Sequence, residues 1–85
     1  MKNLRKDTIL LPTDRGVLTL TYTLSLDEDG AYAIALLNRT TGESAVLCDL
    51  TPNWDKALGL YDLLVRGGVT VVTFRDVVED VLAAG

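Results

Sequence analysis

Apolar residues follow two different periods along the chain, and the period changes at Pro52. Before Pro52 they recur at every second position, which is typical of strands with one buried face. After it they recur at every third or fourth position, which is typical of helices with one apolar stripe. The pattern predicts a sheet in the first part of the chain and helices in the second.

Four segments in the first part are predicted to be strands. The clearest is Val17–Leu26, because large apolar residues alternate there with Thr and Ser. A short first strand is predicted at Thr8–Leu11, and two further strands at Ala31–Asn38 and Glu43–Leu50. Residues that favour turns separate these segments, and residues 1–6 are expected to fray.

Side-chain polarity predicts the register of the first hairpin. A three-residue loop that ends at Gly30, with this glycine in the left-handed region, would place Leu24 opposite Ile34. A four-residue loop would set Leu24 against Ala33 and mix large apolar residues with small ones. The acidic run Asp27–Asp29 is then a charged hairpin tip, because it lacks the ligand spacing of a calcium loop.

The same type of loop is predicted at Thr40–Gly42 in the second hairpin. It would place Leu36 opposite Val46 and Ile34 opposite Cys48, so that one face of the sheet is large and apolar throughout. Cys48 is therefore expected to be a buried packing residue. A catalytic thiolate needs a base and an electropositive setting, and the chain contains no histidine.

Two helices are predicted in the second part of the chain. The first has Thr51 as N-cap and Pro52 at the first helical position, and it runs to about Arg66 before Gly67–Gly68. The second has Thr73 as its N-cap. Its apolar stripe consists of Phe74, Val77, Val78, Val81 and Leu82.

Strands followed by consecutive helices favour the α+β class. We predict an antiparallel meander of four strands, the first one short, followed by two helices packed on one face (ββββαα). Residues 1–85 are expected to form a single domain, whose core the 48% hydrophobic composition can supply. The single cysteine excludes an intrachain disulfide, and the absence of histidine removes the commonest ligand of a structural zinc ion.

The formal net charge of −4 disfavours a nucleic-acid partner, because such binding depends on neutralising phosphates. The apolar run Ile9–Leu11 behind the basic N-terminus is too short for a signal peptide, and no later run reaches transmembrane length. We therefore expect a soluble cytoplasmic protein without membrane contact.

The segment Leu64–Asp80 (LVRGGVTVVTFRDVVED) resembles the C-terminal part of a family of small uncharacterised proteins from Gram-positive bacteria. The family pattern often has a proline where this chain has Val71. The resemblance covers roughly the last quarter of the chain. Because no function is attached to the family, it implies no site residue.

The first predicted helix has an apolar arc wider than contact with one sheet requires. Trp54, Leu60 and Leu63 on that helix are predicted to form an interface, since exposed apolar clusters mark interfaces and Trp is a typical anchor. The alternative is that all three are core or scattered surface residues. A second candidate patch, on the far face of the sheet, consists of Val17, Leu37 and Leu47.

Three tyrosines offer polar groups to a pocket between sheet and helices, namely Tyr22, Tyr32 and Tyr61. The acidic residues Asp76, Glu79 and Asp80 share one face of the last helix and could hold a hard cation. Helix capping and solvation explain those acids better, so we expect no metal and no cofactor.

No catalytic constellation emerges, and the predicted pairing places no two acids on the inner face of the sheet. We therefore expect a protein without enzymatic activity. The sequence favours a small intracellular protein-interaction module that binds a protein partner or itself, with a homodimer expected. The alternative is a small-ligand-binding domain with a pocket between sheet and helices.

Overall fold

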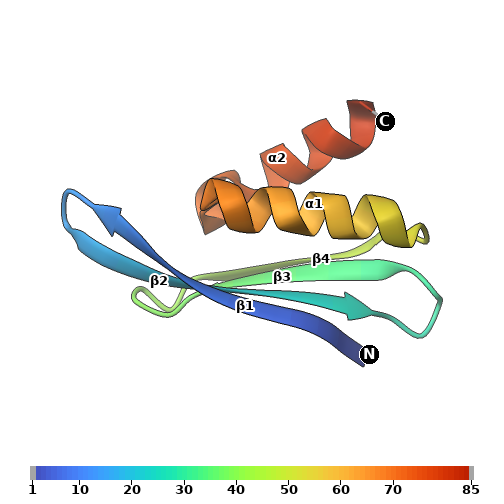
Figure 1. Cartoon of the computed structure of the whole chain (residues 1–85), viewed down its shortest axis with the longest axis horizontal. Coiled ribbons are helices and arrows are strands. Elements are labelled where there is room, and N and C mark those ends of the chain that lie inside the picture. Colours follow the sequence, from blue (N-terminus) through green and yellow to red (C-terminus); the bar gives the residue numbers. More distant parts are fainter. Residues whose placement is uncertain (1, 85) are drawn as a thin grey trace.

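Two layers make up the molecule, a four-stranded antiparallel sheet and a pair of helices that cover one of its faces (Figure 1). The computed structural model describes residues 2–84. In chain order the elements are β1 (Lys2–Thr13), β2 (Gly16–Leu26), β3 (Tyr32–Asn38), β4 (Ser44–Thr51), α1 (Trp54–Gly67) and α2 (Val71–Ala84). The predicted α+β class and ββββαα order are confirmed.

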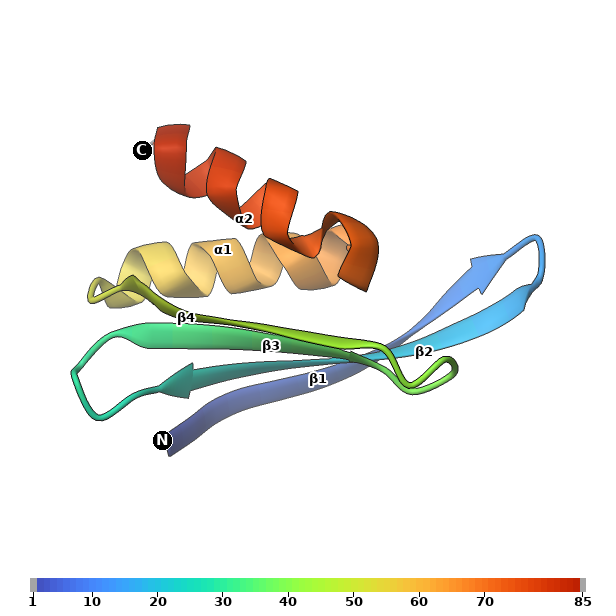
Figure 2. The same ribbon diagram turned by 180° about the vertical axis from the view of Figure 1, so that it is seen from behind.

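The strands lie in the order β1-β2-β3-β4, so β1 and β4 form the two edges of the sheet. Views from both sides place α1 and α2 on the same face (Figure 2). Among residues 2–84, no helix or strand covers the opposite face, which we call the open face.

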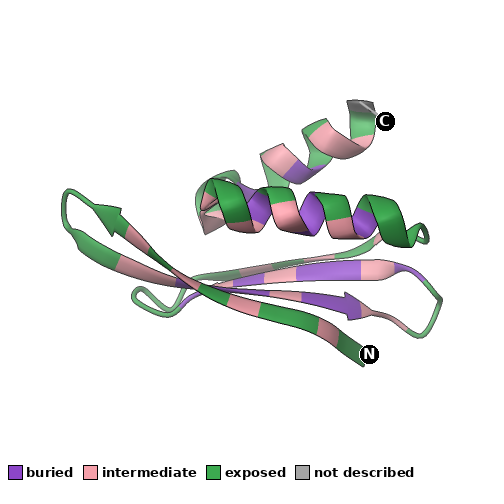
Figure 3. Cartoon of the chain, viewed as in Figure 1, coloured by how far each residue is buried: buried purple, intermediate pink, exposed green. Residues whose placement is uncertain are grey.

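The core fills the space between the two layers. Its buried side chains come from the helix-facing sides of β2 and β3 and from one stripe on each helix (Figure 3). The largest fully buried side chains are Tyr22, Tyr61, Phe74, Leu20, Leu24, Ile34, Leu36, Leu64 and Val78. The tip of the β1–β2 hairpin extends past the helices and is exposed (Figure 3).

The first hairpin has the predicted register. Leu24 pairs with Ile34, and Gly30 has a φ of +85°, in the left-handed region that glycine adopts without strain. The amide of Asp27 donates to the carbonyl of Ala31 at 2.9 Å, which closes a three-residue loop. The Asp27 carboxylate in turn accepts a hydrogen bond from the Ala31 amide at 3.1 Å, a contact typical of Asp in turns.

The first strand is 12 residues long, so the prediction of a short strand at Thr8–Leu11 was wrong. It pairs with β2 from Lys2 opposite Leu26 to Thr13 opposite Gly16, with one register shift between Asn3 and Arg5. Residues 2–6, which the sequence predicts to fray, are therefore in the sheet, whereas Met1 lies outside the described residues. Residues 2–6 join the sheet because the backbone amides and carbonyls of β2 need hydrogen-bond partners. Their charged side chains are tolerated because β1 is an edge strand and these residues do not contribute to the core.

The second hairpin differs from its prediction because its loop has four residues between Asn38 and Glu43. The Asn38 amide donates to the Glu43 carbonyl at 2.8 Å, and the Asn38 side-chain oxygen accepts two loop amides at 3.0 and 3.2 Å. Asn stabilises turns in this way. As a result Ile34 pairs with Leu47, and the predicted pairing with Cys48 was wrong.

This one-residue difference reverses the two faces of β4. Cys48, predicted to be buried, is exposed. Leu47, predicted to lie on the far face, packs against the core, and Val46 is 55% exposed in its place. A second irregularity follows at Asp49, whose φ of +58° is unusual outside glycine and coincides with a further shift in the pairing of β3 and β4.

The first helix begins later than predicted. Its N-cap is Asn53, whose side chain accepts a hydrogen bond from the Lys56 amide at 3.1 Å. Thr51, the predicted N-cap, is the last residue of β4 instead. The predicted end is confirmed, because Gly68 caps the helix with a φ of +58°.

The second helix begins at Val71, two residues before the predicted N-cap Thr73. The hydroxyl of Tyr22 donates to the Val69 carbonyl at 2.7 Å and holds the link between the helices close to the sheet. Val71 can then pack against the core as the first helical residue. The predicted apolar stripe is confirmed: Phe74 and Val78 are buried, and Val77, Val81 and Leu82 pack against the core.

Candidate functional site

The interface residues predicted on α1 differ in exposure. Trp54 is 40% exposed and Leu63 is 48% exposed, whereas Leu60 is 2% exposed and belongs to the core. Trp54 and Leu63 are separated by about two and a half helical turns, so they point to opposite sides of α1. The Trp54 ring packs on Tyr32 with ring centroids 5.5 Å apart. The three residues therefore do not form one exposed surface, and Leu60 is a core residue.

Two of the three tyrosines predicted to serve a pocket hold the layers together. The Tyr22 hydroxyl donates to the Val69 carbonyl, and the Tyr61 hydroxyl donates to Asp7 Oδ2, each at 2.7 Å. Both residues are fully buried. Tyr32 lies apart from them, at the start of β3 beside α1.

Burial changes the acidity of the two buried tyrosines. It raises the pKa of Tyr22 to about 12. The pKa of Tyr61 is also raised, first by burial and then by its hydrogen bond to Asp7 and the negative charge of that carboxylate. Both phenols are therefore neutral hydrogen-bond donors at neutral pH.

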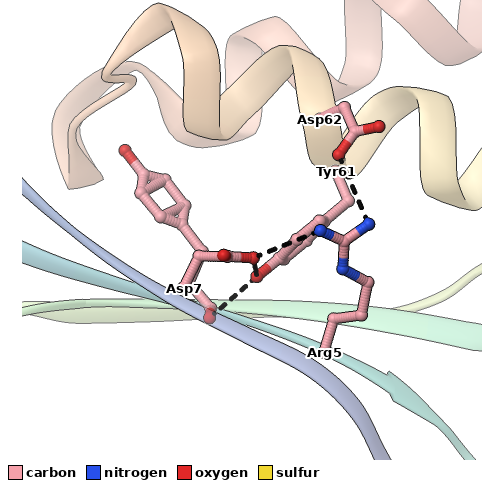
Figure 4. A network of polar contacts seen from close by, with 5 residues as sticks. Arg5, Asp7, Tyr61 and Asp62 are labelled. Atoms are coloured by element: carbon pink, nitrogen blue, oxygen red, sulfur yellow. Dashed lines mark hydrogen bonds and ion pairs between the residues drawn. The ribbon is translucent and has the colours of Figure 1, made fainter.

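A polar network joins β1 to α1 beside Tyr61 (Figure 4). Arg5 lies 3.9 Å from Asp7 and 3.8 Å from Asp62, and its guanidinium lies 5.7 Å from the centre of the Tyr61 ring. All three charged side chains are more than a third exposed, so these long ion pairs add little stability. The network positions an edge strand against a helix.

One groove lies between β4, α1 and α2. It has a volume of about 450 Å³ and is lined on its apolar side by Leu50, Leu60, Val81 and Leu82. Gly59 leaves open space at its border, since a Cβ atom there would meet nothing within 4 Å. None of the three predicted pocket tyrosines lines this groove.

A second groove crosses the open face, and we call it the trough. It has a volume of about 500 Å³. Its lining includes the apolar side chains of Leu37 and Val46, the hydroxyls of Thr21 and Thr23, and the cations Lys6 and Arg39. The trough therefore combines an apolar floor with hydrogen-bonding groups and positive charge.

Leu37 was predicted to lie on the far face of the sheet, but neither cation was predicted to reach that face. Lys6 was assigned to a frayed terminus, and Arg39 fell between the predicted strand Ala31–Asn38 and the predicted loop Thr40–Gly42. The sequence does contain one signal for these cations. The alternating Thr residues in Val17–Leu26 predict a sheet face made of short polar side chains. Long cations on the neighbouring segments cover such a face.

Neither a metal site nor a membrane-spanning helix is found among the described residues. Within residues 2–84, no three His, Cys, Asp or Glu side chains come close enough together to hold a metal ion. No helix in the same range is both long enough and apolar enough to cross a membrane.

The resemblance of Leu64–Asp80 to a bacterial family stays a prediction. No protein-family model matches the chain, and no curated protein or solved structure is significantly similar to it.

Proposed function

We propose that this chain is a small protein-interaction module and that the open face of its sheet is the docking surface. The observation that carries the proposal is the trough, an indentation with an apolar floor on a face that no described element covers. Exposed apolar side chains on a small domain favour an interface.

Exposed apolar residues extend along the same face. Leu10 is 69% exposed, and Val17 and Val46 are each 55% exposed. The pairing of β1 with β2 sets Leu10 opposite Thr19 and Val17 opposite Pro12, on the side away from the core. A partner that covers the trough can therefore continue over the β1–β2 hairpin.

A photo-reactive amino acid in place of Val46 tests this proposal. Val72 is the matched control, because it is also an exposed valine, at 80%, but lies on α2 in the helix layer. In extracts of cells that make the chain, we expect the probe at Val46 to form one discrete adduct that mass spectrometry identifies as a protein. Adducts from Val72 alone, or none from Val46, would contradict the proposal.

The groove between the helices and β4 favours a second candidate function, the binding of a small apolar ligand. Its lining combines four apolar side chains with the polar residues Thr51, Asp55 and Lys56, and Gly59 keeps it open. An apolar fluorescent dye is expected to bind the native chain there, and Gly59→Leu is expected to abolish that binding by filling the groove. Equal dye binding by both proteins would rule out this site.

A further inference from the structure

Two cations reach the trough, Lys6 from the edge strand β1 and Arg39 from the turn that follows β3. The Nε of Arg39 donates to Thr21 Oγ1 at 3.0 Å, so the guanidinium lies over β2 on the open face. Thr21 is only 4% exposed, although no helix covers it, and its hydroxyl also lies 3.0 Å from that of Thr8 on β1. Lys6 lies on β1 directly opposite Thr23, and both cations line the trough.

Sheet geometry gives the separation between the backbone position of Lys6 and Thr21, on which the Arg39 guanidinium is held. Thr21 and Thr23 are two residues apart on β2, and Lys6 lies one strand away from Thr23. With about 4.8 Å between strands and about 6.7 Å along two residues, the anchoring points of the cations are roughly 8 Å apart. In an extended peptide, side chains at positions i and i+2 point the same way and are also about 6.7 Å apart.

The charges in the trough are not balanced by the protein. Its lining contains no acidic residue. Among residues 2–84, neither Lys6 nor Arg39 has an ion-pair partner within 4 Å, although the whole chain carries a net charge of −4. Carboxylates are the natural complement of such a pair, because charge-assisted hydrogen bonds to Arg and Lys are strong and steer association.

We propose that the trough binds an extended acidic segment of a partner protein, with carboxylates at positions i and i+2 on Lys6 and Arg39. The methylene groups of glutamates, or a flanking aliphatic residue, would cover Leu37 and Val46 on the floor. This inference rests on the proposed docking surface and adds the chemistry of the partner.

Two other occupants fit less well. A second copy stacked on the same face would bring another Lys6 and Arg39 into the interface, and four cations without a carboxylate would repel each other. A nucleic acid needs several phosphates neutralised at once, and the trough offers two cations on an acidic chain.

The test uses the 85-residue chain and a fluorescent peptide, Val-Thr-Glu-Thr-Glu-Thr-Val, with blocked termini, in which both valines share a face with both glutamates. Fluorescence polarisation measures binding, and amide NMR shifts of Thr21, Thr23 and Leu37 locate it. We expect Lys6→Glu and Arg39→Glu each to weaken binding by roughly tenfold or more, since an attraction becomes a repulsion. Arg75→Glu is the matched control, because it makes the same change in charge at an exposed position of α2, and it is expected to leave binding unchanged.

The peptide with both glutamates replaced by glutamine separates the two proposals. If it binds the trough as well as the glutamate peptide does, the acidic partner is ruled out while the docking surface stands. If neither peptide binds and the probe at Val46 forms no adduct, both proposals fail. An equal loss of binding in Arg75→Glu, tighter binding of a single-stranded oligonucleotide, or a dimer that forms through the trough also overturns the acidic-partner inference.

Discussion

The hydroxyl of Tyr61 lies 2.7 Å from Asp7 Oδ2 and joins α1 to the edge strand β1 across 54 residues of sequence. Asp7 pairs with Tyr22 in the ladder, so its side chain is on the helix-facing side of the sheet. The same hydroxyl lies 3.1 Å from the Tyr22 carbonyl. An acidic residue is tolerated beside the core here because a buried donor from α1 satisfies it.

We expect Tyr61→Phe to destabilise the protein by about 1–2 kcal/mol, because it removes a hydrogen bond to a charged group and leaves a buried carbonyl with one fewer donor. The matched comparison is Arg5→Gln, which removes the two longer ion pairs of the same network and should cost less than about 1 kcal/mol. Urea unfolding of both variants measures the difference. A larger loss in Arg5→Gln than in Tyr61→Phe would show that the ion pairs hold β1 in place.

Stability is expected to fall steeply with pH above pH 10. Burial raises the pKa of Tyr22 to about 12 from the ordinary value of 10.0, and the pKa of Tyr61 is raised as well. Between the unfolded and folded values, the unfolded chain has lost phenolic protons that the folded chain keeps. Rising pH therefore favours unfolding, and the stabilisation present below pH 10 is lost as pH rises through the folded pKa values.

Denaturant titrations from pH 8 to pH 12 measure this slope, with the Tyr22→Phe variant as control. Tyr22→Phe should be less stable at pH 8, because the hydrogen bond to Val69 is gone. Its stability should nevertheless fall less between pH 10 and pH 12. Identical slopes in the variant and the parent would mean that Tyr22 is not the titrating group.

The sequence predicted strand register and helix packing correctly where the size of the side chains determines them. In the first hairpin, only one register keeps Leu24 and Ile34 on the same face, and the structure adopts it. The core stripe of α2 followed from the spacing of Phe74 and Val78 in the same way. Burial of large side chains is the dominant favourable term in such a fold, so their pattern is informative.

Local hydrogen bonds determine the structure of the second hairpin, which the hydrophobic period did not predict correctly. The Asn38 side chain holds a four-residue loop, and this contact leaves little trace in the hydrophobic period. Because the loop gained one residue, the face of every side chain from Ser44 to Cys48 changed. The trough depends on Lys6, which was assigned to a frayed terminus, and on Arg39, which was assigned to no element, so the candidate site could not be assembled from the sequence.

Cys48 should react with thiol reagents in the native protein almost as fast as in denaturant. Its side chain is exposed on the edge strand β4, whereas the register predicted from the sequence would bury it. Labelling rates measured with and without urea test the observed register of the second hairpin. Labelling that needs urea would restore the predicted pairing with Ile34.

The same substitution should have opposite effects at Gly59, inside α1, and at Gly68, which caps its C-terminus. Gly68→Ala is expected to cost about 1–2 kcal/mol, since Gly68 has a φ of +58° and a Cβ there would lie 3.2 Å from Leu11 Cδ1. Gly59→Ala is expected to stabilise by about 0.5–1 kcal/mol, because Ala favours the helix interior and meets nothing within 4 Å. Thermal unfolding of both variants checks the signs, and a stabilising Gly68→Ala would contradict the left-handed cap.

Self-association through α1, expected from the sequence, is tested cleanly by Leu63. Because Leu63 is 48% exposed, Leu63→Asp should change the stability of the isolated chain by no more than about 1 kcal/mol. Leu60→Asp is unsuitable, because it places a charge at a position that is 2% exposed and should cost more than about 3 kcal/mol. Because Trp54, Leu60 and Leu63 do not form one exposed surface, light scattering over a range of concentrations should give the same mass for the parent chain and for Leu63→Asp. A lower mass for Leu63→Asp than for the parent chain would make this side of α1 a self-association surface.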